Sequence, residues 1–298
     1  MTTVTAAELA ELKSAHPELL IIDCRLEAEF DASHLPDAKS NCVFEIAFID
    51  RMSALAPDKH LPVSVYGSFG SRESQVAAEK LVRAGYSNVY ALEDGIETWK
   101  ASNLPIDEQL LSPAPEQEPR EGEYPIRVES SLLEWTGRNL ASKHWGTIQV
   151  NSGFLTFQDG VPISGYVAFD TTTISSQDIQ DPSLKKVLDD HLKSDDFFDV
   201  DRFPEATFSL VRVCRLVSTN LGTPNLHVEG RLTIKGTTEP IDFLANDGID
   251  SEGNWTMQAN FDIDRTSFNV FYGSGRLFKK IGMHLVNDLI SIQIKLSA

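Results

Sequence analysis

Two patterns of hydrophobic and polar residues divide the chain. In the first hundred residues, short apolar runs alternate with stretches in which apolar residues recur at helical spacing. Strands are predicted at 19–23, 63–66 and 89–92, and helices near 5–15, 44–55, 74–84 and 95–100. Thr5 and Glu8 have the spacing of a capping box, and Gly85 stands where the third helix should end. This alternation favours an α/β domain with a mostly parallel sheet.

The second half consists of short alternating or β-branched runs separated by Gly, Asn and Asp turn signals. Strands are predicted at 130–135, 147–150, 153–157, 163–169, 206–213, 225–234, 241–245, 255–263 and 289–296. One segment, 181–191, has a helical pattern instead, and an aromatic turn containing Phe197 and Phe198 follows it. The pattern indicates an antiparallel barrel or sandwich with one short helix.

Between the two halves the composition changes. Residues 107–123 contain three prolines and six acidic residues, which is typical of an extended, solvated linker. The predicted organisation is an α/β domain over 1–107, an acidic proline-rich linker over 108–123 with its boundary near Pro115, and an all-β domain over 124–298.

The net charge of the chain argues against some classes of binding partner. The formal net charge is −18, the pI is near 4.7, and no run of five Lys or Arg residues occurs. Binding to nucleic acid or anionic lipid by electrostatics alone is therefore disfavoured.

Three cysteines are an odd number, and their spacing does not suit a disulfide framework or a zinc site. With neither a basic leader nor an 18-residue apolar run, the sequence predicts a cytoplasmic protein without a membrane span.

The most informative stretch follows the strand at 63–66. A strand that enters a tight loop at a helix N-terminus builds an anion site, because backbone N–H groups and the helix dipole both favour negative charge. The loop has six residues, Gly67, Ser68, Phe69, Gly70, Ser71 and Arg72. A cysteine at its first position would be a reactive thiolate, but that position is glycine. Ser68, Ser71 and Arg72 could hold a small anion, and the alternative is a turn without a ligand.

The first half resembles the rhodanese-like family over residues 5–107. The resemblance rests on segments 22–25, 29–30 and 34–38, on the loop 67–72, and on segments 85–89 and 92–95 with Trp99. In that family the first loop residue is the cysteine that carries a persulfide, so Gly67 implies an inactive module. Cys24 and Cys42 are interpreted as packing residues, and Asp23, Arg25 and His34 as structural hydrogen-bond partners.

The second half resembles the YceI-like family of lipocalin-like barrels over residues 124–298. The block 191–208 is the most specific match, supported by 144–146, 230–236, 264–268 and 286–290. The resemblance implies an eight-stranded antiparallel barrel that encloses a polyisoprenoid or another long amphiphile. No cofactor is expected, and the ligand would be of the isoprenoid or fatty-acid type.

Two kinds of residue are candidates for binding such a ligand. Phe169, Phe197, Phe208 and Phe268 could line the interior. Polar-tipped side chains near a mouth could hold a head group, and these are His144, Trp145, Arg265 and Tyr272. Structural hydrogen bonds at strand ends are the alternative role for the polar set. The histidines show no metal-ligand spacing, so no metal site is predicted.

The leading hypothesis is therefore a non-enzymatic binding protein attached to a catalytically inactive rhodanese-like module. The enzymatic alternative is a sulfurtransferase that uses thiosulfate or a related donor, with a lipid-binding domain appended. A third reading is an interaction module, in which the first domain contacts a partner protein, the barrel of its own chain or a second copy in a dimer. If the loop is otherwise intact, replacing Gly67 with cysteine should create a persulfide that cyanide can cleave.

Overall fold

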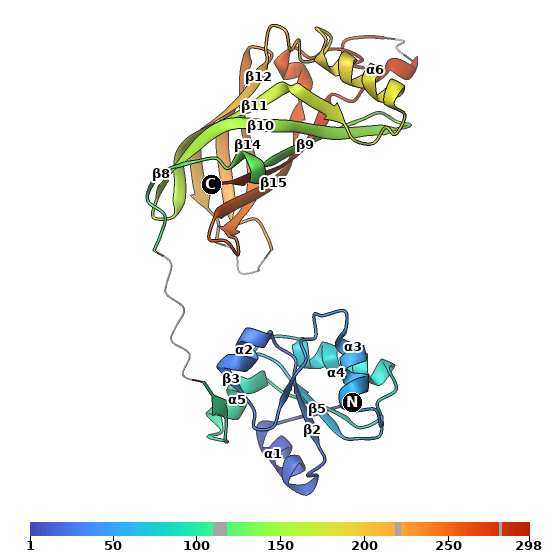
Figure 1. Ribbon diagram of the computed structural model, residues 1–298, viewed down its shortest axis with the longest axis vertical. Helices are drawn as coiled ribbons and strands as arrows, with labels where there is room; N and C mark the ends of the chain where they lie inside the picture. The colour runs from blue at the N-terminus through green and yellow to red at the C-terminus, as the bar shows by residue number, and fades with distance from the viewer. Residues whose placement is uncertain (110–117, 218–221, 280–281) are drawn as a thin grey trace. The chain divides into compact units, whose positions relative to one another are not determined.

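The computed structural model describes residues 1–109, 118–217, 222–279 and 282–298. The chain forms two compact units, Met1–Glu116 and Gln117–Ala298, each with its own hydrophobic core (Figure 1). Much of the predicted linker, residues 110–117, lies outside the described residues, so the linker stays a prediction.

A parallel five-stranded sheet forms the centre of the first unit, in the order β1-β6-β5-β2-β4. Its strands are β1 (Thr2–Val4), β2 (Leu20–Asp23), β4 (Lys39–Ser40), β5 (Val63–Tyr66) and β6 (Val89–Leu92). A separate antiparallel pair joins β3 (Ser33–His34) to β7 (Asp107–Glu108). The helices are α1 (Ala6–Ala15), α2 (Glu27–Ala32), α3 (Phe48–Leu55), α4 (Glu73–Arg83) and α5 (Gly95–Ala101). The α/β domain with a mostly parallel sheet is confirmed.

The two faces of this sheet have separate cores, because successive side chains of a strand point to opposite faces. Ile22 and Val65 pack with residues of α3 and α4, whereas Ile21 and Tyr66 pack with α1 and α5. The sheet is therefore covered on both sides, as a buried parallel sheet requires. Its carboxyl edge carries the loop at 67–72.

Local signals place most elements correctly in this unit. Thr5 and Glu8 form the expected capping box at the start of α1, and Gly85 follows α4 with φ +95°. The helix expected from residue 44 begins only at Phe48. Phe44 and Ile46 are exposed, so the first part of that apolar pattern has no core to pack against.

The second unit is a closed antiparallel barrel of eight strands, as expected. The strands are β9 (Leu132–Arg138), β10 (Lys143–Gln158), β11 (Val161–Ser176), β12 (Glu205–Arg215), β13 (Leu226–Ile234), β14 (Thr237–Ile249), β15 (Trp255–Asp264) and β16 (Leu289–Ser297). Each pairs with its neighbours in the order β11 through β16, then β9 and β10, and pairing of β10 with β11 closes the barrel. The short β8 (Gly122–Pro125) adds to β10, and a 3-10 turn (Val128–Ser130) leads into β9.

Two strands expected at 147–150 and 153–157 are one strand, β10, which is sixteen residues long. Its pairing with β11 shifts register at Thr147/Gln149 and at Val150/Ser152. Such bulges bend a long strand around a barrel, and they interrupt the alternation that sequence analysis depends on.

The predicted helix is α6 (Pro182–Lys193), which follows β11. It lies at the same end of the barrel as residues 265–279 and 282–288, and the carboxyl terminus lies at the opposite end (Figure 1). We call these the mouth end and the closed end, for reasons given below.

Candidate functional site

The barrel encloses an apolar cavity of about 230 Å³. Every barrel strand contributes to its wall, because alternate residues of each strand point inward. The wall is mostly aliphatic and aromatic, with members such as Trp135, Val167, Phe208, Phe243 and Ile292. Among the described residues that line it, none is Asp or Glu. The cavity therefore suits a slim apolar chain.

Aromatic rings packed edge to face plug one end of the barrel. The buried Trp255 ring packs edge-on against Phe157, with centroids 5.4 Å apart, and Phe157 meets Tyr124 at 5.6 Å. The guanidinium of Arg120 lies 4.6 Å from the Tyr124 centroid and donates hydrogen bonds to the carbonyls of Gly253 and Ala298. This is the closed end.

At the other end, α6 covers the cavity with one face. Leu188 and Leu192 from α6 line the cavity, together with Phe197 and Phe198 from the turn that follows. The carboxylate of Asp189 holds the helix to the end of β11, which we call the α6 latch. It accepts hydrogen bonds from Ser176 N–H at 2.7 Å, from Ser176 Oγ at 2.8 Å and from Ser175 Oγ at 3.1 Å.

An aromatic cluster of His191, Phe197 and Tyr272 stands beside the cavity at this mouth end. The His191 ring centroid lies 5.0 Å from that of Phe197 and 4.6 Å from that of Tyr272. Phe197 lines the inner cavity, whereas Tyr272 lines an outer, more open cleft of about 640 Å³. His284 and Lys235 also line this outer cleft. The cluster therefore separates an apolar interior from a polar exterior.

In the first unit, the loop 67–72 connects β5 to α4 as expected. Two of its N–H groups already have anionic partners within the chain. Ser68 N–H donates to Glu73 Oε2 at 2.7 Å, and Phe69 N–H donates to Glu97 Oε2 at 2.7 Å. Glu73 and Glu97 lie in the first turns of α4 and α5. These carboxylates thus use two N–H groups that could otherwise bind an external anion.

The start of α5 packs directly on this loop. Ile96 N–H donates to the Gly67 carbonyl at 3.0 Å, and a side chain at Gly95 would come within 2.8 Å of Phe69 N. Gly95 has φ +69°, which favours glycine. The loop is consequently held between two helix N-termini.

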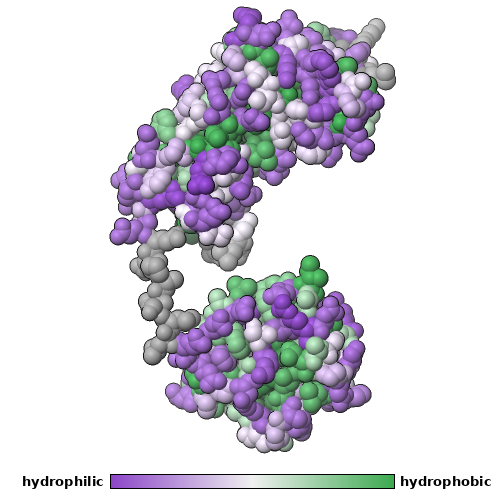
Figure 2. Space-filling model, viewed as in Figure 1, coloured by the Kyte–Doolittle hydropathy of each residue, from purple (hydrophilic) through white to green (hydrophobic). Residues whose placement is uncertain are grey.

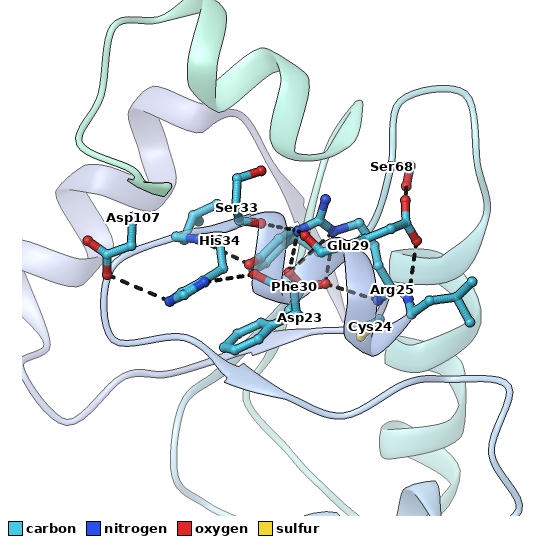
Figure 3. Close-up of polar contacts among 12 residues, drawn as sticks. Asp23, Cys24, Arg25, Glu29, Phe30, Ser33, His34, Ser68 and Asp107 are labelled. Carbon is cyan, nitrogen blue, oxygen red and sulfur yellow. Dashed lines mark hydrogen bonds and ion pairs between the residues drawn. The ribbon is translucent and has the colours of Figure 1, made fainter. Parts of the chain in front are cut away.

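A buried ion pair organises the neighbouring edge of the sheet (Figure 3). Arg25 Nη2 donates to Asp23 Oδ2 at 2.6 Å and to the Ser33 carbonyl at 2.6 Å. His34 stacks on Phe30 with centroids 4.0 Å apart, and its Nδ1 lies 2.9 Å from the Phe30 carbonyl. These side chains hold α2 and β3 against the sheet, which is the structural role expected of them.

The thiols of this unit are buried. Cys24 and Cys42 are 0% and 6% exposed. Burial, followed by the charges of Asp23 and Glu73, raises the pKa of the Cys24 thiol well above its ordinary value. Its thiolate is therefore disfavoured.

Models of protein families match both halves of this chain. The model of the YceI-like domain matches residues 124–298, which is more than half of the sequence. The chain belongs to the YceI-like family. The model of the rhodanese-like domain matches residues 5–102, so a rhodanese-like domain precedes the YceI-like domain.

Individual relatives match one domain or the other. An HTH-type transcriptional regulator of Mycobacterium tuberculosis is 30% identical over 105 residues, which is 35% of this chain and 44% of the regulator. Thiosulfate sulfurtransferase GlpE of Coxiella burnetii is 36% identical over 90 residues, 30% of this chain and 79% of GlpE. A solved polyisoprenoid binding domain from Saccharophagus degradans is 14% identical and covers 60% of this chain and 98% of its own, with a TM-score of 0.44.

The structure brings most predicted ligand residues of the YceI-like domain to one cavity. Its lining includes His144, Phe169, Phe197, Phe208, Arg265 and Phe268. Trp145 lines neither the cavity nor the outer cleft, and its backbone N–H donates to Asp178 Oδ1 at 3.0 Å. Tyr272 lines the outer cleft instead of the cavity.

The other polar candidates also have protein partners, and Tyr272 Oη lies 3.2 Å from His284 Nδ1. His144 Nδ1 lies 2.9 Å from Asp178 Oδ2. Arg265 is 4% exposed and donates to the carbonyls of Val270 at 2.7 Å, Val286 at 3.0 Å and Asn287 at 3.0 Å. Burial lowers the pKa of Arg265. These contacts tie Arg265 to the chain at Val270 and at 286–287.

Several functional side chains were not identified by sequence analysis. Glu73 and Glu97 could be read only as acidic residues near helix starts, and Asp189 only as a polar residue on α6. Within the described ranges, no group of three or more His, Cys, Asp or Glu side chains could hold a metal ion. In the same ranges, no helix has the length and apolar character needed to cross a membrane.

Proposed function

We propose that the YceI-like domain holds the apolar chain of a long amphiphile, of the isoprenoid or fatty-acid type. The observation that carries this proposal is the cavity inside the barrel, whose walls come from all eight strands and contain no carboxylate among the described residues. The plugged closed end leaves the mouth end under α6 as the route of entry.

Enclosure matters for such a ligand. Each CH₂ group left in water costs about 0.8 kcal/mol, so a chain that leaves a bilayer needs a site that surrounds it. Phe169 and Phe208 on adjacent strands, together with Leu192 from α6, surround the cavity on several sides. A groove open along its length would lose the same chain to the membrane.

Organic extraction of the purified full-length chain, followed by mass spectrometry, tests the proposal. We expect one dominant long-chain amphiphile in near-stoichiometric amount. The matched control is Ala206→Phe, which adds a ring at a buried position of the cavity wall. It should retain the fold by circular dichroism and carry much less ligand. An empty native barrel that also fails to bind a fluorescent polyene fatty acid would refute the proposal.

We propose further that the rhodanese-like domain does not transfer sulfur. Glycine at position 67 supplies no nucleophile, and Glu73 and Glu97 occupy N–H groups of the loop. The buried Cys24 does not offer a thiolate in its place. All three cysteines have free thiols, which agrees with a reducing, cytoplasmic setting.

A thiosulfate:cyanide assay tests this second proposal. We expect no thiocyanate above the background given by a variant that lacks both Cys24 and Cys42. Turnover by the native chain would contradict the proposal, and its loss in Cys42→Ser alone would identify the thiol responsible.

A further inference from the structure

The two ends of the barrel are built from different segments. Strand directions place the turns at 139–142 and 235–236, α6 with its flanking residues 177–204, and residues 265–279 and 282–288 at the mouth end. The turns at 159–160 and 250–254, residues 118–123, and residues 216–217 and 222–225 lie at the closed end. The two ends can therefore be compared directly.

Six exposed apolar side chains lie at the mouth end, on three segments that are far apart in the sequence, while the closed end carries Leu216 and Val217. Leu140 at the tip of the β9–β10 turn is 95% exposed, and Leu184 and Val187 on α6 are 62% and 68% exposed. The segment 265–288 adds Phe271, Leu277 and Phe278, which are 41%, 53% and 48% exposed. We call these six residues the mouth surface. In Figure 2 hydrophobic residues reach the surface at this end of the barrel among hydrophilic ones.

Charge distinguishes the two ends as well. The mouth-end segments 138–144, 177–204, 235–236, 265–279 and 282–288 contain ten basic and nine acidic residues. The closed-end segments 118–123, 159–160, 216–217, 222–225 and 250–254 contain one basic and six acidic residues. The described mouth-end segments therefore lack the net negative charge of the closed-end segments, and a negative membrane surface would repel them less.

We infer that the mouth surface docks on a lipid bilayer, where the cavity loads and releases its ligand. The inference rests on the proposed function, because a water-insoluble ligand must pass between membrane and cavity without crossing water. α6 suits this position: Leu188 and Leu192 face the cavity, while Leu184 and Val187 remain free to enter the interface. An amphipathic helix that lies in the plane of a membrane buries such residues to the depth of the head groups.

Flotation of the full-length chain with phosphatidylcholine vesicles tests the inference. We expect native protein to float with the vesicles and to remain bound at high salt, since apolar contact is the main attraction. Leu140→Glu and Val187→Glu should each lower the vesicle partition coefficient about tenfold, because burial of one aliphatic side chain is worth roughly that factor. Both sites are exposed, so the substitutions should leave the fold intact.

The matched control is Val217→Glu at the closed end, where the side chain is 101% exposed. It should float like the native chain. Binding of a fluorescent polyene fatty acid, free in solution, is measured on the same proteins and should be unchanged in all three variants. Native protein that binds the fatty acid without floating would overturn the docking inference and leave the proposed function standing. Flotation that requires anionic lipid, or that Val217→Glu abolishes equally, would also overturn it.

Discussion

Two glutamates accept hydrogen bonds from the loop 67–72 of the rhodanese-like domain. Backbone N–H groups at a helix N-terminus attract an anion, and here Glu73 and Glu97 supply one from within the chain. Ser68 Oγ also donates to Glu29 Oε1 at 3.4 Å. The loop is therefore surrounded by carboxylates, which would repel a thiosulfate ion as well as occupy its donors.

This arrangement changes what Gly67→Cys should do. A Cβ atom at position 67 would clash with the Glu73 carboxylate and lie 2.7 Å from Glu73 Cβ. The single variant should therefore form little persulfide with thiosulfate, even if it folds. Gly67→Cys combined with Glu73→Ala removes the carboxylate from the new side chain and frees Ser68 N–H, although the close Cβ–Cβ approach remains. The double variant should form at least tenfold more persulfide, measured by cyanolysis.

The control for this pair is Glu73→Ala alone, which should be inert because it lacks the thiol. Equal persulfide in the single and double cysteine variants would show that Glu73 does not block the loop. No persulfide in a folded double variant would mean that Glu97 and the remaining geometry suffice to exclude the anion.

Sequence analysis could identify the glycine at the first position of the loop but not the carboxylates that accept hydrogen bonds from the loop. Gly67 is visible because the strand, the six-residue loop and the helix are all local in sequence. Glu97 reaches Phe69 N–H across 28 residues, and that contact depends on how α5 packs against the loop. The sequence shows an acidic residue in a first helical turn, but it does not show which N–H group that residue will meet.

At the scale of elements, the α6 latch controls the mouth of the cavity. Removing the carboxylate in Asp189→Ala leaves the Ser176 N–H without its partner, which should cost about 1–3 kcal/mol. Backbone amides of 182–193 should then exchange with deuterium at least tenfold faster. Asp190→Ala is the matched control, since the Asp190 carboxylate pairs with Lys186 on the exposed side of the helix.

The latch should also respond to acid. Burial raises the pKa of Asp189, but hydrogen bonds from Ser176, Lys185 and Ser175 outweigh it and hold the pKa below the ordinary 3.8. A carboxyl group with a lowered folded-state pKa stabilises the fold above 3.8, and that stabilisation is lost as the pH falls through the lowered value. Native α6 should therefore loosen only below pH 3.8, and Asp189→Ala should abolish this acid dependence. If the amides of α6 exchange no faster in Asp189→Ala than in the native chain, the Asp189 carboxylate does not hold the helix in place.

A glycine inside the barrel supports an aromatic side chain of the cavity wall. A Cβ atom at Gly230 on β13 would overlap the Phe208 ring and lie 2.8 Å from the Ser209 carbonyl. Gly230→Ala should therefore push the ring into the cavity, lower stability by about 1–3 kcal/mol and weaken binding of the polyene fatty acid. Gly248→Ala on β14, where a Cβ meets nothing within 4 Å, should change stability by less than about 0.5 kcal/mol. Stability is measured by denaturant unfolding and binding by titration with the fatty acid. Equal losses in the two variants would contradict the proposed contact between position 230 and the Phe208 ring.

Elements with local signals were predicted well, and those shaped by the barrel were not. The capping box at Thr5 and the pattern of α6 needed only nearby residues. β10 was expected as two strands because its bulges break the alternation, and Phe44 suggested an earlier start for α3 because exposure is invisible in a pattern. The cavity itself follows from barrel closure, so sequence analysis could name Phe169 and Phe208 but could not separate cavity residues from Tyr272 in the outer cleft.

For the whole molecule, two independent cores predict two unfolding transitions. The parallel sheet of the rhodanese-like domain and the barrel bury separate sets of apolar side chains. A ligand that binds only the folded barrel stabilises it by about 2.7 kcal/mol at one hundred times its dissociation constant. In calorimetry of the full-length chain, the added amphiphile should therefore raise one transition and leave the other in place. Gly230→Ala identifies the barrel transition by lowering it, and Ala206→Phe should make that transition insensitive to the amphiphile. If both transitions shift together, the domains unfold as one unit. If the amphiphile raises only the transition that Gly230→Ala leaves unchanged, the ligand binds the rhodanese-like domain.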